Sequence, residues 1–223
     1  MGLVIFGGSN IVSDLFDCAL ALGMPIEQVV THLPEPDDER SLPLARRLDA
    51  LAALGVRPTV VALDDFAPQP GQQYLLGPTT PARAALARLL QQRHGLEFCT
   101  LVHPTAYVSP LSTLSPGVFI GANSVIGPGA ALAPHVFINR GVTIGHDTSI
   151  GAYSRVQPGS NVGGLTRIGT GVTVGIGATV IERLVIGDGA FIGAGAVVTG
   201  DVEPRVLMVG IPAKFKKALA GPD

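Results

Sequence analysis

A strict six-residue repeat fills the second half of the chain. Val, Leu or Ile stands at every sixth position from Val102 to Val198, seventeen positions in all, without a break in the frame. The next residue is glycine in nine of these units, and the fifth position is mostly Ala, Ser, Thr or Val. A short fixed period of this kind is typical of a solenoid, in which each repeat packs only on its neighbours.

The repeat predicts a β-solenoid in which three units form one triangular coil. The aliphatic side chain is expected to point inward and to stack on its equivalent eighteen residues away, while the small fifth residue fills the remaining interior. We expect the glycines that follow the aliphatic residues to provide the backbone conformations of the corners. Proline occupies the third position in six units (104, 110, 116, 128, 134 and 158), which suits a rigid corner. Seventeen units predict nearly six coils.

The first hundred residues follow a different pattern. Short apolar runs predict strands at 3–6, 29–30, 59–63 and 73–77, and helical periodicity predicts helices near 15–22, 45–54 and 82–92. The arginines of the last helix are expected on its outer face. Alternating strands and helices indicate a small α/β domain with a mainly parallel sheet. The sequence therefore predicts two domains, an α/β domain at 1–100 and a β-helix domain at 101–223 with a short C-terminal tail.

Composition limits the function classes. The 223 residues are 47% hydrophobic and 14% charged, which excludes a disordered chain. A net charge of −2 provides no broad surface for nucleic acid or an anionic membrane. No apolar run is long enough for a membrane span, and the N-terminus lacks the pattern of a signal peptide. Cys18 and Cys99 show no metal-ligand spacing and are expected to be reduced thiols. We expect a soluble cytoplasmic protein without nucleic-acid or membrane partners.

The pair His146-Asp147 stands within the otherwise aliphatic and glycine-rich sequence of the repeat. His146 takes the third, corner position of its unit, so its side chain can point outward. Its neighbours eighteen residues away, Pro128 and Gly164, are both short and leave a notch around the ring. An imidazole that is largely neutral near pH 7 suits a general base, which contributes ~100- to 10,000-fold in rate. The alternative is a solvated corner histidine without a catalytic role.

Three motifs together resemble one protein family. They are the hexapeptide repeat, the junction LVHPTAYVSP at 101–110 and the terminal VGIPAK at 209–214. These residues resemble the hexapeptide-repeat acyltransferases with a left-handed β-helix, in particular the sialic-acid and bacillosamine type of sugar O- and N-acetyltransferases. The resemblance covers essentially the whole chain. It implies acetyl-CoA as co-substrate, no metal, and a homotrimer that binds the cofactor between neighbouring subunits.

The resemblance also implies roles for residues of the repeat. His146 would remove the proton of the attacking amine or hydroxyl, Asp147 would orient the imidazole, and the N–H of Gly164 would stabilise the oxyanion. A cysteine or serine nucleophile is not expected beside His146, so the acetyl group would be transferred directly.

Other residues match positions that contact acetyl-CoA in the related enzymes. These are Arg155, Ile176 and Ala194, and Arg155 stands where relatives often carry a second histidine, so that a cation could meet a CoA phosphate. Lys214, with two further lysines at 216 and 217, could meet the nucleotide phosphates of CoA. The alternative for these lysines is the solvated face of an amphipathic terminal helix.

By the same resemblance, the N-terminal domain binds a nucleotide-linked sugar at the turn after its first strand. That turn is Gly7, Gly8, Ser9 and Asn10, and a turn of this kind before a helix can receive phosphate. The sequence departs from the family at three places: Asn10-Ile11 replaces a Gly-His pair, THLPEPDDE (31–39) follows the second strand, and GPTTP stands at 77–81. These departures argue against a uridine-linked sugar and leave room for another nucleotide or a different acceptor.

We therefore expect an N-acetyltransferase that acts on a nucleotide-linked amino sugar for surface glycans. A sugar O-acetyltransferase and a non-catalytic, nucleotide-binding β-solenoid scaffold are the alternatives. A metal site built from His103, His135 and His146 would resemble the γ-class carbonic anhydrases, but the spacing shows no ligand cluster. His103 is interpreted as a structural or capping residue and His135 as a corner residue that could line the site. His32 and His94 are assigned no role.

Overall fold

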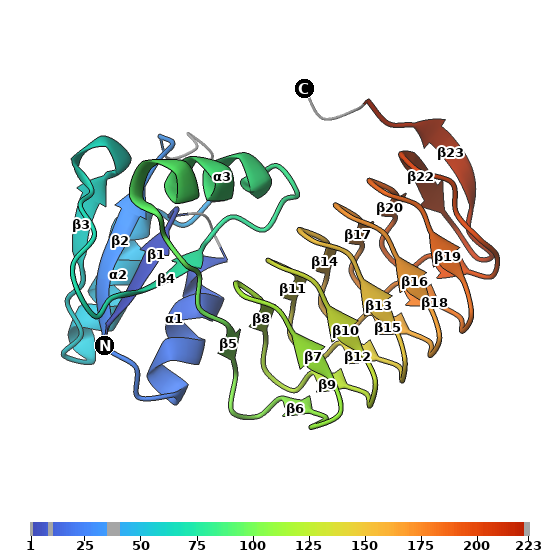
Figure 1. The fold of residues 1–223 in the computed structure, drawn as a ribbon, viewed down its shortest axis with the longest axis horizontal. Coiled ribbons are helices and arrows are strands. Elements are labelled where there is room, and N and C mark those ends of the chain that lie inside the picture. Colours follow the sequence, from blue (N-terminus) through green and yellow to red (C-terminus); the bar gives the residue numbers. More distant parts are fainter. Residues whose placement is uncertain (1, 9–10, 35–40, 221–223) are drawn as a thin grey trace. The chain divides into compact units, whose positions relative to one another are not determined.

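The computed structural model describes residues 2–8, 11–34 and 41–220. The chain divides into two compact units, and each is described by itself. The first unit groups residues 1–79 with 85–99, and the second groups residues 80–84 with 100–223. Figure 1 shows helices and a short sheet in the first unit, and successive flat coils in the second.

The first unit contains a parallel four-stranded sheet in the order β3-β2-β1-β4. Its strands are β1 (Leu3–Phe6), β2 (Ile26–Thr31), β3 (Thr59–Ala62) and β4 (Gln73–Leu76). The helices are α1 (Val12–Ala21), α2 (Leu44–Ala53) and α3 (Arg83–His94), and a short 3-10 turn spans Leu63–Asp65. Each predicted strand and helix is present within a few residues. The strand β1 is buried along its whole length, as expected for an apolar strand inside a parallel sheet.

One expectation about the last helix is wrong. Arg88 and Arg93 are exposed, but the side chain of Arg83 is only 4% exposed. Arg83 belongs to the second unit, and its guanidinium donates hydrogen bonds to the carbonyl oxygens of Thr80, His135 and Ser154 of the same unit. Because backbone carbonyls satisfy its donors, the cation tolerates burial. Burial is also the main reason why the pKa of Arg83 falls to about 9.

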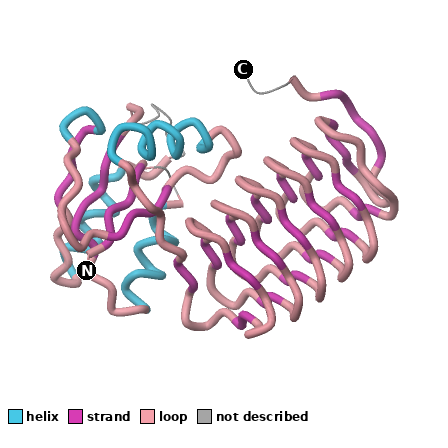
Figure 2. Tube along the Cα trace, in the orientation of Figure 1, coloured by secondary structure: helices cyan, strands magenta, loops and turns pink. Residues whose placement is uncertain are grey.

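The second unit is a β-solenoid of two-residue strands, which Figure 2 shows as short segments separated by turns. Its five-stranded sheet contains β7 (Thr113–Leu114), β10 (Ala131–Leu132), β13 (Ser149–Ile150), β16 (Arg167–Ile168) and β19 (Val185–Ile186). Its six-stranded sheet contains β6 (Tyr107–Val108), β9 (Val125–Ile126), β12 (Thr143–Ile144), β15 (Asn161–Val162), β18 (Thr179–Val180) and β21 (Val197–Val198). Within these two sheets, equivalent residues eighteen positions apart pair in parallel.

The eight-stranded sheet includes the C-terminal hairpin. Its strands are β5 (Leu101–Val102), β8 (Phe119–Ile120), β11 (Phe137–Ile138), β14 (Arg155–Val156), β17 (Thr173–Val174), β20 (Phe191–Ile192), β22 (Val206–Val209) and β23 (Lys214–Ala218). The strand β23 pairs antiparallel with β22 and forms the last strand of this sheet. The alternative reading of the terminal lysines as part of a helix is therefore wrong.

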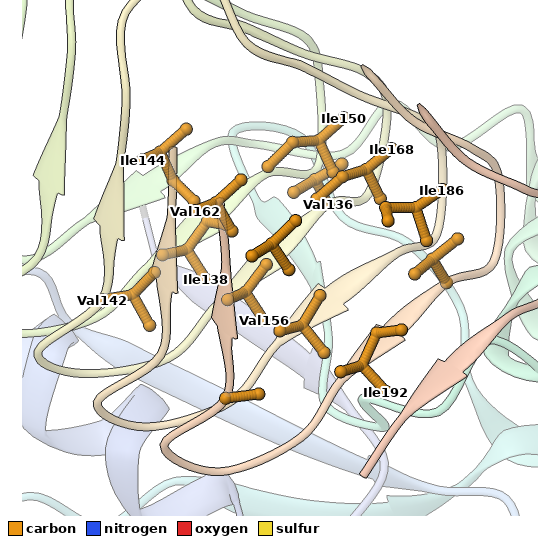
Figure 3. Close-up of a cluster of buried hydrophobic side chains, with 14 of the residues drawn as sticks. Val136, Ile138, Val142, Ile144, Ile150, Val156, Val162, Ile168, Ile186 and Ile192 are labelled. Atoms are coloured by element: carbon orange, nitrogen blue, oxygen red, sulfur yellow. The ribbon is translucent and has the colours of Figure 1, made fainter. Parts of the chain in front are cut away.

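The repeated aliphatic residues form the core of the solenoid, as predicted. From Ile120 to Val198 all of them are at most 3% exposed, and the first three, Val102, Val108 and Leu114, pack partly buried against this cluster. Figure 3 shows several of these side chains stacked along the interior. The sequence pattern and the packing agree because each coil buries one aliphatic side chain from each of its three faces.

A matched pair of isoleucines tests this core. Ile150 is 1% exposed, whereas Ile176 is 60% exposed on the outside of the same solenoid. We expect Ile150→Ala to lower the free energy of unfolding by about 3 kcal/mol, because it removes buried methyl groups and leaves a cavity. Ile176→Ala is expected to change it by less than about 0.5 kcal/mol. Urea denaturation of both variants checks this, and equal losses would contradict the inward assignment.

The glycines at the second position of the repeat were expected to provide the backbone conformations of the corners, and this expectation is wrong. Left-handed backbone occurs at the fourth position of every unit from Gly117 to Gly195, whether or not that residue is glycine. The glycine at the second position has no positive φ. A side chain there is excluded because the backbone of the next coil lies too close: a β-carbon on Gly127 would lie 2.9 Å from the nitrogen of His146. Glycine is therefore needed at the second position because adjacent coils approach closely there, and not because of the backbone conformation of the corner.

The third position of each unit has a distinctive backbone N–H. Among residues 101–200, all of them described, none of the N–H groups at this position donates to a backbone carbonyl. Proline is therefore tolerated there without the loss of a ladder hydrogen bond, which explains its six occurrences. Where another residue occupies the position, its N–H remains available to a side chain or a ligand. Thr170 illustrates this, since its N–H donates to the carboxylate of Asp188.

Candidate active site

His146 and Asp147 lie on one edge of the solenoid, where turns connect the six-stranded sheet to the five-stranded sheet. We call this the His146 edge; its third-position residues include Pro128, His146 and Gly164. The side chains of His146 and Asp147 are 58% and 59% exposed. Nδ1 of His146 lies 2.9 Å from Oδ2 of Asp147. In the tautomer that donates from Nδ1 to the carboxylate, Nε2 carries the free lone pair.

Asp147 adopts a left-handed backbone with φ 55°, which aspartate tolerates better than most residues. Its N–H donates to the carbonyl of Pro128 at 2.9 Å, so the preceding coil fixes its position. A β-carbon on Gly129, the residue beneath it, would overlap Oδ1 of Asp147. The sequence Pro128-Gly129 thus leaves space for the carboxylate on one side of the His-Asp pair.

The imidazole extends the other way, over Gly164 of the next coil. A β-carbon on Gly164 would lie 2.7 Å from Nε2 and 2.8 Å from Cδ2 of His146. The carbonyl of His146 accepts a hydrogen bond of 2.8 Å from Leu165, which holds the two coils in register. Because residue 164 is glycine, the imidazole of His146 can lie against this coil, with Nε2 next to Gly164.

The corner at 163–165 leaves the N–H of Gly164 without a hydrogen-bond partner in the described ranges. The N–H of Gly163 donates to Val180, and the carbonyl of Gly164 accepts from Arg183. The carbonyl of Gly163 accepts from the hydroxyl of Thr148 at 3.0 Å. No acceptor for the N–H of Gly164 lies within the described ranges of the chain. A hydrogen-bond donor therefore remains next to Nε2 of His146, and a base beside such a donor suits acyl transfer.

Glycine at a second position keeps this donor open. A β-carbon on Gly145, the residue before His146, would overlap the nitrogen of Gly164. Any other residue at 145 would therefore cover the N–H group or displace the coil. Sequence reasoning had assigned no role to Gly145 or Thr148, although each stands next to the His-Asp pair.

The predicted cofactor residues lie elsewhere on the same unit. Ile176 and Ala194 stand on the edge where turns connect the eight-stranded sheet to the six-stranded sheet, which we call the Ile176 edge. They stack as expected: Gly177 donates to the carbonyl of Pro158, and the residue after Ala194 donates to the carbonyl of Ile176. The six-stranded sheet separates this edge from the His146 edge. One chain alone therefore does not bring the two groups of residues together.

Arg155 and Lys214 belong to the eight-stranded sheet that leads into the Ile176 edge. Arg155 lies on β14, where its Nε donates to the hydroxyl of Thr173 at 3.1 Å. Burial lowers the pKa of its guanidinium. Lys214 begins β23 and pairs with Val209, next to the coil that carries Ala194. Lysines on a terminal strand also discourage pairing with other chains, which is an alternative role for this cluster.

The structure confirms the reading of His103 as a capping residue and revises that of His135. Nδ1 of His103 contacts the hydroxyl of Thr105 at 2.9 Å and accepts its N–H at 3.2 Å, so His103 caps the first turn. His135 lies on the remaining edge, where turns connect the five-stranded sheet to the eight-stranded sheet. It is 4% exposed and stacks on Tyr153 with 4.9 Å between the ring centroids. It does not line the His146 site, because their spacing of eleven residues puts the two corners on different edges. His103 and His146 also occupy different edges, and no cluster of three metal-ligating side chains occurs in the described part of the chain.

The predicted sugar-binding turn is only partly described. Ser9 and Asn10 lie outside the described residues, and Gly7 and Gly8 follow β1. Gly7 has φ 105° and is packed between two side chains, since a β-carbon there would lie 3.1 Å from Cε1 of His32 and 2.8 Å from Cδ of Pro78. His32 therefore stands beside Gly7 at the carboxyl edge of the sheet, where open α/β sheets bind ligands.

The two cysteines are free and belong to the first unit. Burial raises the pKa of Cys18 to about 12 and that of Cys99 to about 11. Thiols with such pKa values are almost entirely protonated near pH 7 and are poor nucleophiles. Among the helices in the described ranges, none is both long and apolar enough to cross a membrane.

Comparisons with known proteins agree with this architecture. The model of the bacterial transferase hexapeptide family (six repeats) matches residues 165–200. Among curated proteins, no sequence matches the chain. In its repeat and its fold, the chain is similar to the bacterial transferases of the hexapeptide type.

Several solved structures match nearly the full length. One is a histidine-to-alanine mutant of GDP-perosamine N-acetyltransferase from Caulobacter crescentus with CoA and GDP-perosamine; it is 28% identical, with a TM-score of 0.80 and 97% of each chain covered. Another is the acetyltransferase domain of PglB from Neisseria gonorrhoeae, 23% identical with a TM-score of 0.80 over 96% of this chain and 99% of that one. WeeI from Acinetobacter baumannii is 22% identical, with a TM-score of 0.70 over 97% and 100%.

Proposed function

We propose that the protein is an acetyl-CoA-dependent N-acetyltransferase that acts on a nucleotide-linked amino sugar in surface-glycan biosynthesis. The observation that carries the proposal is the position of Nε2 of His146 beside the unbonded N–H of Gly164. The 28% identity with GDP-perosamine N-acetyltransferase over 97% of both chains supports the substrate class.

The proposed reaction follows from this geometry. Nε2 of His146 removes a proton from the amino group as its nitrogen attacks the thioester carbonyl of acetyl-CoA. The N–H of Gly164 donates to the oxyanion of the tetrahedral intermediate, while Asp147 holds the imidazole through Nδ1. The intermediate then collapses, the C–S bond breaks, and the imidazolium returns the proton to the CoA thiolate. The products are an acetamido sugar and free CoA.

The separation of the His146 edge from the Ile176 edge has a consequence for the oligomeric state of the protein. His146 and Gly164 lie on one edge, whereas Ile176 and Ala194 lie on another, so a cofactor that touches both groups must lie between two chains. We propose a homotrimer in which the His146 edge of one subunit faces the Ile176 edge of the next. Arg155 and Lys214 would then approach the phosphates of CoA from the second subunit. Size-exclusion chromatography with light scattering measures this state directly.

An activity assay tests the proposed function. The purified protein is incubated with acetyl-CoA and GDP-perosamine, free thiol is measured, and the mass and the NMR spectrum of the nucleotide sugar give the number and the position of the acetyl groups. We expect thiol release matched by the gain of one acetyl group on nitrogen. Acetylation of a hydroxyl group in place of the amine would establish the O-acetyltransferase alternative. If acetyl-CoA and nucleotide sugars of GDP, UDP and dTDP all yield no product, the chain is not the proposed enzyme and the scaffold alternative gains support.

A further inference from the structure

We infer that Thr148 is a positioning residue for the proposed oxyanion donor, an inference that rests on the proposed function. The hydroxyl of Thr148 donates to the carbonyl oxygen of Gly163 at 3.0 Å, and Thr148 is 1% exposed. That carbonyl belongs to the same peptide unit as the N–H of Gly164. The hydrogen bond therefore acts on the group that would stabilise the reaction's negative charge.

The geometry of the peptide unit fixes the direction of the donor. In a trans peptide the C=O and N–H bonds point in opposite directions within one plane. The Gly163 carbonyl points toward the buried Thr148, so the Gly164 N–H points toward the outside of the solenoid, where the His146 ring lies. Two glycines flank this peptide bond, and glycine has the largest backbone freedom of any residue. Hydrogen bonds of the Gly163 N–H and the Gly164 carbonyl hold the two flanking peptide units, and the hydroxyl of Thr148 holds the peptide unit between them.

The fold does not require a hydroxyl at this place in every unit. The fifth position of the repeat is Ala130 one coil before Thr148 and Val142 in the preceding unit, and neither can donate a hydrogen bond. Thr166, at the same place one coil later, donates to the carbonyl of Ile181 at 3.2 Å and is also fully buried. Thr166 thus makes the same structural contact at a corner that carries no donor for the reaction.

This pair provides a matched test. Thr148→Val and Thr166→Val each replace a buried hydroxyl by a methyl group of the same shape and leave one corner carbonyl without its donor. We expect Thr148→Val to lower kcat about tenfold, the effect of about one neutral hydrogen bond, with the KM for acetyl-CoA within about twofold. Thr166→Val is expected to keep the kcat of the wild type. Thr148→Ser, which retains the hydroxyl, is expected to recover most of the activity.

Steady-state kinetics with acetyl-CoA and the nucleotide sugar, together with the melting temperatures of all three variants, decide the matter. Equal melting temperatures for the two valine variants with a kcat loss in Thr148→Val alone support the inference. Equal kcat for Thr148→Val and Thr166→Val would overturn it, and so would failure of Thr148→Ser to recover activity. An inactive wild type would instead refute the proposed function, so the two failures are distinguishable.

Discussion

Replacement of His146 by alanine is expected to lower kcat about a thousandfold, because the attacking amine loses the group that takes its proton. The KM for acetyl-CoA should stay within about twofold of the wild type, since the imidazole contributes to the transition state rather than to cofactor binding. The side chain is 58% exposed, so its removal costs little stability. Initial rates of thiol release over a range of acetyl-CoA concentrations give both constants.

A second histidine provides the control. His94 lies in the first unit, in the last turn of α3, with its ring 5.4 Å from that of Phe66. His94→Ala should lower the melting temperature slightly and leave kcat unchanged. Full acetyl transfer by His146→Ala would show that the base assignment is wrong. A comparable loss in both variants would point to folding instead of chemistry, and circular dichroism of each variant separates these outcomes.

Addition of a single methyl group at position 164 is expected to reduce kcat about a hundredfold. In Gly164→Ala the new β-carbon would lie 2.7 Å from Nε2 and 2.8 Å from Cδ2 of His146, so the imidazole must move away from the donor. The backbone at 164 does not have a positive φ, which means that alanine is not strained there. Because the obstructed atoms belong to an exposed side chain, we expect the fold to tolerate the change.

Gly200 provides a matched glycine. It stands at the same third position of the His146 edge, two coils beyond Gly164, and a β-carbon there would have no neighbour within 4 Å. Gly200→Ala should therefore retain wild-type kcat and stability. Equal activity of the two alanine variants would contradict the assignment of Gly164 to the reaction centre.

A double variant separates the two ways in which Gly164→Ala can act. If the methyl group acts by displacing the imidazole, it will add little to the defect of His146→Ala, because the two changes affect one interacting unit. An additional large loss in the double variant would show that the methyl group also impairs binding of the thioester. Kinetics of the four proteins, measured under one set of conditions, complete the cycle.

The fixed spacing of stacked residues in the solenoid explains why several predictions from the sequence were right. The stacking partner of every aliphatic residue lies eighteen positions away. Ile138, Ile144 and Ile150 therefore belong to the three successive faces of one coil, and the sequence alone predicts this. The same regularity marked His146 as an outward corner residue and Gly164 as its neighbour. Local strand and helix patterns likewise revealed the parallel sheet of the first unit, since β1 is apolar throughout.

Readings that depended on contacts outside this regular frame were wrong. Arg83 was expected at a helix surface, but carbonyls near His135 and Ser154 surround its guanidinium. Lys214 was considered for a helix, although it pairs with Val209 in the terminal strand. In both cases the deciding partner lies at a sequence separation that no repeat or helical period specifies.

The sequence by itself determined the solenoid, its inward residues and the edge on which His146 stands, because a six-residue period with close stacking permits few other folds. Only the tertiary structure showed which groups contact one another at the corner formed by residues 163–165. It showed that a β-carbon at Gly145 would meet the nitrogen of Gly164, that a β-carbon at Gly164 would meet the ring of His146, and that the hydroxyl of Thr148 donates to the carbonyl of Gly163. The direction of one peptide plane depends on a hydrogen bond between adjacent coils, and residue types alone do not encode that direction.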